Sequence, residues 1–95
     1  MVVGTGKITL KLYDIHSLKG KRKIVKSQIQ RLKNKFNISI AETGLNGDLE
    51  WAELGFSITG NDRKRINSTL DKIVEMLESM GLARITDTRI EIINY

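Results

Sequence analysis

The chain of 95 residues contains neither cysteine nor proline, and aromatic residues make up only 5% of it. The absence of cysteine excludes a disulfide framework and a thiolate metal site. No apolar run exceeds three residues, which is too short for a membrane-spanning helix. The first residues also lack the basic stretch and apolar run of a signal peptide. We therefore expect a soluble, cytoplasmic protein.

The length and composition fit one globular domain that spans residues 1–95. Hydrophobic residues make up 40% of the chain and charged residues 28%, which is close to the ordinary balance of folded domains. A chain of this size buries about 60 to 65% of its unfolded surface, whereas two domains would each be too small for a core.

An alternation of apolar and polar residues marks the first expected strand, at residues 7–14. Ile8, Leu10 and Leu12 occupy every second position, which is the period of a half-buried strand. A helix is expected to follow, because apolar residues then recur at helical spacing between an N-cap candidate, Ser17, and a terminating residue, Asn37. These apolar positions are Leu18, Val25, Ile29, Leu32 and Phe36.

The next two strands are expected at residues 38–43 and 49–59. Between them lies Asn46-Gly47, the dipeptide that most favours a tight type I′ hairpin.

A second helix with one apolar face is expected before Gly81, which suits a left-handed C-terminal cap. Its apolar positions are Ile66, Leu70, Ile73, Leu77 and Met80. A last strand at residues 84–93 completes the order βαββαβ. This order predicts an α+β, ferredoxin-like sandwich, in which two helices cover one face of a four-stranded antiparallel sheet of order 4-1-3-2.

Positive charge is concentrated in the first expected helix. The net charge of the chain is +5, yet residues 19–35 hold eight basic residues and no acidic residue. The other 78 residues have a balance of −3. The basic residues of the segment are Lys19, Lys21, Arg22, Lys23, Lys26, Arg31, Lys33 and Lys35.

This concentration favours a surface that binds phosphates, and RNA in particular. Four of the cations lie at the helix start, where the helix dipole disfavours positive charge, so stability does not explain them. The alternative is a solvated face whose charges pair with Glu42, Glu50 or Glu53 across the fold. The predicted nucleic-acid contacts are Lys19, Lys21, Arg22, Lys23, Lys26 and Lys33.

Two aromatic residues form a second candidate surface on the open face of the sheet. Tyr13 and Trp51 are expected at one end of neighbouring strands, where bases could stack on them, although a structural role for the tryptophan is the simpler alternative. With a two-residue hairpin turn, Ile38 and Ile40 would share the face of Trp51 and form an apolar patch suited to a dimer. A β-bulge would remove this patch.

No catalytic or metal-binding pattern is present. The glycine-rich segment at residues 4–7 lacks the upstream glycine of a phosphate loop, and Ile8 stands where that loop requires Ser or Thr. The single histidine, His16, has no carboxylate or nucleophile arranged around it in sequence. We therefore expect no enzyme, no cofactor and no small-molecule substrate.

Several segments spread over nearly the whole chain form a recognisable pattern. They are His16-Ser17-Leu18-Lys19-Gly20-Lys21-Arg22-Lys23, Val25-Lys26-Ser27, Phe36-Asn37-Ile38-Ser39-Ile40-Ala41-Glu42, Trp51, Leu54-Gly55, Asn61-Asp62 and Asp71-Lys72. This pattern resembles that of the small bacterial YlxP-like proteins of unknown function.

The resemblance implies a ferredoxin-like fold and no established activity, cofactor or catalytic residue. Genes of that family often lie among translation and ribosome-maturation genes, which suggests contact with RNA or the ribosome. The family often has Glu where this chain has Gly20, and that Glu would complete a capping box with Ser17.

The sequence therefore predicts a non-catalytic RNA-binding or ribosome-associated accessory protein that contacts phosphates through a basic helix. The alternative is a protein-interaction or homodimerisation module that uses the open face of the sheet.

Overall fold

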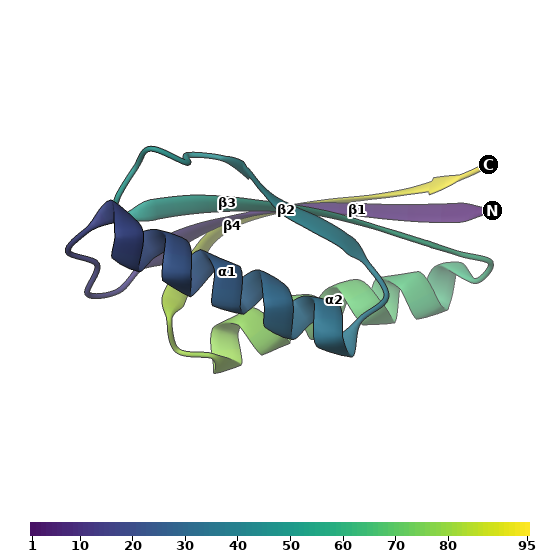
Figure 1. The fold of residues 1–95 in the computed structure, drawn as a ribbon. Helices are drawn as coiled ribbons and strands as arrows, with labels where there is room; N and C mark the ends of the chain where they lie inside the picture. Colours follow the sequence, from purple (N-terminus) through teal and green to yellow (C-terminus); the bar gives the residue numbers. More distant parts are fainter.

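A computed structural model describes residues 1–95 and has the predicted order of elements. The elements are β1 (Val2–Leu12), α1 (Leu18–Lys35), β2 (Ser39–Gly44), β3 (Trp51–Gly60), α2 (Arg63–Ser79) and β4 (Ala83–Asn94). The antiparallel strands lie in the order β2-β3-β1-β4, which is the predicted order named from the opposite edge. Both helices lie on one side of this sheet (Figure 1). The ferredoxin-like sandwich is thus confirmed.

The core lies between the sheet and the two helices and contains 15 buried apolar residues. Strand β1 contributes every second side chain to it, as the alternation of Ile8, Leu10 and Leu12 predicts. Helix α2 contributes its aliphatic stripe at spacings of four, three and four residues. Its start is capped by Asp62, whose Oδ1 accepts a hydrogen bond from the Lys64 amide at 2.9 Å. Its end is followed by Gly81 at φ 67°, the predicted left-handed cap.

Strand β1 begins five residues earlier than predicted, because its glycines belong to the sheet rather than to a loop. A Cβ atom on Gly6 would collide with the ring of Phe56, which stands directly opposite on β3. A Cβ atom on Gly4 would lie 2.6 Å from a methyl group of Ile66. The two glycines therefore leave room on the strand for side chains that arrive from neighbouring elements.

The predicted tight hairpin between β2 and β3 is wrong. The strands are joined by six residues, 45–50, and positive φ occurs at Leu45 (59°) instead of at Asn46 and Gly47. A type I′ turn needs positive φ at both central positions. The amide of Asp48 donates to the Leu45 carbonyl at 3.0 Å, so Asn46 and Gly47 are the central residues of a β-turn inside this longer loop.

Candidate polyanion-binding face of helix α1

Helix α1 begins at its predicted cap, where Ser17 Oγ accepts a hydrogen bond from the Gly20 amide at 3.0 Å. Its buried face is rotated relative to the predicted apolar stripe. The residues with buried side chains are Lys21, Val25, Gln28 and Leu32, whereas the predicted Leu18, Ile29 and Phe36 are only partly buried. Two polar residues thus occupy the side of the helix that faces the sheet.

Lys21 was predicted to contact phosphates, but its side chain is inaccessible and serves the fold. Its Nζ atom lies 3.2 Å from Glu42 Oε2 in an ion pair and donates a hydrogen bond to the carbonyl of Leu45 at 2.5 Å. The carbonyl of Asn46 lies 3.5 Å away. Glu42 Oε2 has no donor in hydrogen-bond geometry, so its interaction with Lys21 is electrostatic rather than directional. Lys21 therefore anchors the loop 45–50. It is not part of the candidate phosphate-binding surface.

Gln28 is the second polar residue on the buried face. Its side chain is fully buried, and neither amide atom has a hydrogen-bond partner. Buried amide groups are nearly always paired, because an unpaired one loses its hydration without compensation. The inner face of α1 is therefore less stabilising than an aliphatic face of the same size.

The outer face of α1 carries the seven remaining cations, and all of them are exposed: Lys19, Arg22, Lys23, Lys26, Arg31, Lys33 and Lys35. None of them has a carboxylate oxygen within 4.0 Å, since the ion pairs of the molecule are Lys21–Glu42 and Arg89–Asp87. The alternative in which the basic residues pair with acidic residues of the fold therefore holds for Lys21 alone. The positive charges of the outer face are therefore not neutralised by carboxylates of the same molecule.

A groove of about 510 Å³ runs along one flank of α1, between the helix and the loop that precedes it. Lys23, Ser27 and Arg31 line it at four-residue spacing, and His16 lines its other side. One carboxylate, Asp14, also borders the groove. Arg31 and His16 were not among the contacts predicted from the sequence. The spacing of four residues from Lys23 to Ser27 and from Ser27 to Arg31 could have indicated that Arg31 lies on the same flank of the helix.

The aromatic pair lies at one end of the sheet, as predicted. Trp51 stands opposite Lys11 in the β1–β3 ladder, and Lys11 Nζ lies 5.6 Å from the centre of its ring. Tyr13 follows the end of β1 and is exposed. Base stacking on these rings stays a prediction, because the lysine already covers one ring at cation–π distance.

The apolar patch predicted on the open face is absent. The β2–β3 register shifts between Glu42 and Gly44, so a bulge intervenes between the turn and the start of β2. Ile40 therefore stands opposite Phe56 and is 7% exposed, and Ile38 packs against the same core. Neither isoleucine is available as an interface residue.

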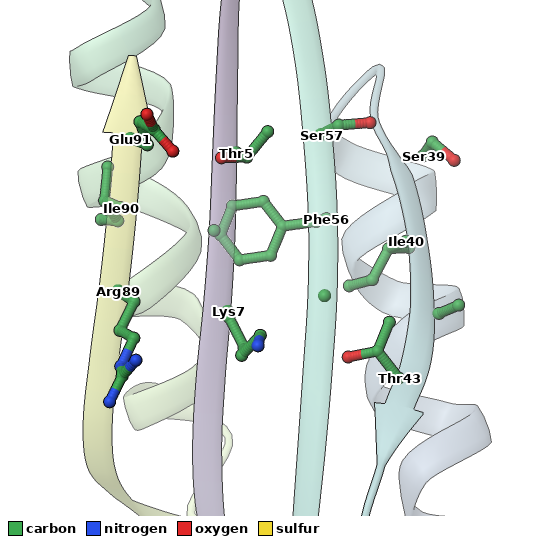
Figure 2. A pocket seen from close by; sticks show the side chains of 13 residues that line it. Thr5, Lys7, Ser39, Ile40, Thr43, Phe56, Ser57, Arg89, Ile90 and Glu91 are labelled. Carbon is green, nitrogen blue, oxygen red and sulfur yellow. The ribbon is translucent and has the colours of Figure 1, made fainter.

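The open face instead holds a shallow depression of about 690 Å³ that is lined by 13 residues, of which four are hydrophobic (Figure 2). Figure 2 shows short side chains such as Thr5 and Ser57 beside the charged Lys7, Arg89 and Glu91. Such a surface resembles a solvated sheet face more than an apolar interface core.

No helix is both long and apolar enough to cross a membrane. No three His, Asp or Glu side chains gather in an arrangement that could hold a metal ion.

The fold is similar to that of solved structures with little sequence identity. A dimeric ferredoxin-like protein from an uncultured marine organism superposes with a TM-score of 0.52 at 11% identity, covering 98% of this chain and 96% of that one. A protein from Arabidopsis thaliana reaches a TM-score of 0.46 at 12% identity, covering 96% and 94%. At this identity the first match supports the fold alone.

Sequence comparison is more specific. The uncharacterised protein YlxP of Bacillus subtilis (strain 168) is 29% identical over 90 residues, which are 95% of this chain and 98% of the relative. The family model described as "Protein of unknown function (DUF503)" matches residues 3–90. The chain therefore belongs to the DUF503 family.

Proposed function

We propose that the outer face of α1 binds the phosphate backbone of structured RNA, including that of the ribosome. The observation that carries the proposal is the complete lack of carboxylate partners for the exposed cations of this helix. The five that the sequence selected and that are exposed are Lys19, Arg22, Lys23, Lys26 and Lys33.

The distribution of charge along α1 supports a ligand rather than a stabilising role. The first turn contains no acidic residue, although acidic side chains there would stabilise the helix. Among the exposed cations, Lys19 lies in the first turn, where the helix dipole makes a cation unfavourable by about 0.3 to 1 kcal/mol, and Arg22 and Lys23 follow in the second turn. A bound phosphate would reverse the sign of this interaction, because anions are favoured at a helix start.

Contacts of this kind confer affinity with little sequence selectivity, since phosphates carry no direct sequence information. Counterions leave the RNA when the cations replace them, so affinity falls as salt rises. The expected slope of log K against log salt is about −0.7 to −0.9 for each phosphate neutralised.

Charge reversal on the outer face tests the proposal. Fluorescence anisotropy with a labelled RNA hairpin, repeated over a salt series, measures affinity and slope for wild type and for Lys23→Glu/Lys26→Glu/Lys33→Glu. We expect the triple variant to lose detectable binding, because three attractive contacts become repulsive. Circular dichroism checks that its fold is retained, as all three side chains are exposed.

A matched control separates a local footprint from net charge. The variant Lys64→Glu/Lys72→Glu/Arg84→Glu changes the net charge equally on exposed positions outside α1. It is expected to keep most of the affinity and the full salt slope. Equal losses in the two triple variants, or no loss in the first, would remove α1 as the binding surface.

Self-association is a second candidate function, favoured by the description of the marine structural neighbour as dimeric. The open-face patch that the sequence suggested for it is absent, because Ile38 and Ile40 belong to the core. A self-association surface must therefore lie elsewhere on the molecule.

A further inference from the structure

Strand β4 forms a free edge of the sheet. It has 12 residues and pairs only with β1, and the order β2-β3-β1-β4 leaves its other side without a neighbour. Proteins usually protect such an edge with proline, bulges or charged side chains, especially lysine. The only irregularity of β4 lies near its start, opposite Thr9/Leu10, and residues 88–94 run on without one.

The free hydrogen-bonding groups of this edge follow from the β1–β4 register. Met1 and Tyr95 exchange two backbone hydrogen bonds, of 3.2 and 2.7 Å, so this is a bonded pair of the ladder. Bonded and non-bonded pairs alternate in antiparallel sheets. The amide and carbonyl groups of Thr88, Ile90 and Ile92 therefore point away from β1, toward the open edge.

The side chains of the same stretch are arranged symmetrically about Ile90. Ile90 is a large apolar side chain in the middle of a strand, yet it is 41% exposed. Its neighbours Arg89 and Glu91 carry opposite charges and share the other face of the sheet, as both stand opposite polar residues of β1. Figure 2 shows the three residues in succession along the outermost strand.

We propose that this edge binds a second copy of the chain, with the two β4 strands antiparallel about a two-fold axis through Ile90. This proposal deepens the self-association candidate and is independent of RNA binding. Ile90 then pairs with the partner's Ile90 through two backbone hydrogen bonds, and the apolar side chains cover each other. Arg89 stands opposite the partner's Glu91, and Glu91 opposite the partner's Arg89.

Neighbouring registers are less favourable. An axis through Arg89 or Glu91 places each of these charges opposite its own copy, which is repulsive. An axis through Ile92 places Glu91 opposite an isoleucine. An axis through Thr88 places Arg89 opposite the partner's Asp87, which is attractive, but it leaves Ile90 opposite Thr86 at the irregular part of β4. The register through Ile90 alone combines free backbone groups, apolar contact and opposite charges.

A charge-swap experiment tests both the dimer and its register. Sedimentation equilibrium over a concentration series measures the dimer Kd of wild type, Arg89→Glu, Glu91→Arg and the double variant. Each single change makes two symmetric contacts repulsive and is expected to raise Kd about tenfold to hundredfold. The double variant restores opposite charges across the axis and is expected to recover dimerisation.

Two further variants control the interpretation. Ile90→Lys places two ammonium groups at the axis and is expected to give a monomer. Arg84→Glu makes the same charge change on the same strand but outside the paired residues, and should leave Kd unchanged. RNA anisotropy on the monomeric variants is a separate readout, because none of these residues belongs to α1.

The proposal fails if wild type sediments as a monomer at every concentration, or if the single variants dimerise as well as wild type. It also fails if the double variant does not recover, since the register predicts that recovery. An unchanged RNA affinity in the monomeric variants would leave the α1 proposal standing in any of these cases.

Discussion

Helices α1 and α2 cover the same face of one sheet, yet their buried faces differ. Four aliphatic side chains of α2 enter the core, whereas α1 buries Lys21 and Gln28 together with two aliphatic residues. The ammonium of Lys21 is paired, but the amide of Gln28 has no partner. Helix α2 is thus the stronger contributor to the core.

The exposed faces of the two helices differ in the same sense. The exposed face of α2 mixes four basic with three acidic residues, whereas α1 exposes seven basic residues and no acidic one. Ordinary packing and solubility explain α2 completely. The composition of α1 is therefore not explained by stability, and the proposed phosphate contacts would account for it.

Among substitutions in the two helices, the largest expected change in the free energy of unfolding is at Lys21 of α1. Lys21→Met retains an apolar stem but leaves the Glu42 carboxylate and the Leu45 carbonyl without their cation. The free energy of unfolding should fall by about 3 to 5 kcal/mol in urea titrations, since a buried pair that loses one member leaves an uncompensated group.

Two comparisons decide whether the ion pair is responsible. Adding Glu42→Gln to Lys21→Met removes the orphaned charge and should recover much of the loss. Lys72→Met on the exposed face of α2 should change stability by no more than about 0.5 kcal/mol. A Lys21→Met variant as stable as wild type would show that the pair does not anchor the loop.

A smaller effect of opposite sign is expected at Gln28. Gln28→Met replaces an unpaired buried amide with an apolar side chain of similar length and should raise the free energy of unfolding by about 1 to 3 kcal/mol. Gln30→Met is the control on the exposed face; it removes only an exposed hydrogen bond to Asn34 Oδ1 and should change the free energy of unfolding by no more than about 0.5 kcal/mol. A loss of stability in Gln28→Met would mean that the amide is hydrogen-bonded in solution.

The smallest effect is expected at the start of α1. Gly20→Glu adds a better helix former and a capping-box partner for Ser17, and should gain about 1 kcal/mol in thermal or urea unfolding. The gain is limited because a Cβ atom here lies 3.2 Å from Ser17 Oγ. Gly20→Ala is the control: it raises the helix propensity without providing a capping-box carboxylate.

RNA affinity should fall in Gly20→Glu only, because only this variant adds a negative charge to the start of the helix. Such a result would link stability and binding at this helix end.

Local sequence patterns predicted the helices and strands well where the conformation depends on residues that are close in the sequence. Ser17 and Gly81 mark helix ends in the sequence, and they do so in the structure, because capping depends on neighbouring residues alone. The alternation in β1 and the stripe of α2 likewise gave the core face directly.

Errors arose where a distant group decides the conformation. Asn46 and Gly47 do form a turn, but it lies within a six-residue loop whose Leu45 carbonyl binds the ammonium of Lys21, 24 residues earlier in the chain. The glycines of β1 resembled a loop, because the side chains that occupy their space come from distant elements, Phe56 from β3 at Gly6 and Ile66 from α2 at Gly4. The candidate site was predicted in outline, but the burial of Lys21 depends on Glu42 and could not be read from helical spacing.

The hydrogen bonds that anchor the loop 45–50 continue beyond it. Lys21 binds the Leu45 carbonyl, the Asp48 amide binds the same carbonyl, and Asp48 Oδ1 accepts from the amide of Trp51 at 3.1 Å. Trp51 is the only tryptophan of the chain. Its backbone amide is thus the last member of a set of hydrogen bonds that begins at α1, and the intrinsic emission of its indole can be followed in unlabelled protein as a reporter of the position of this loop.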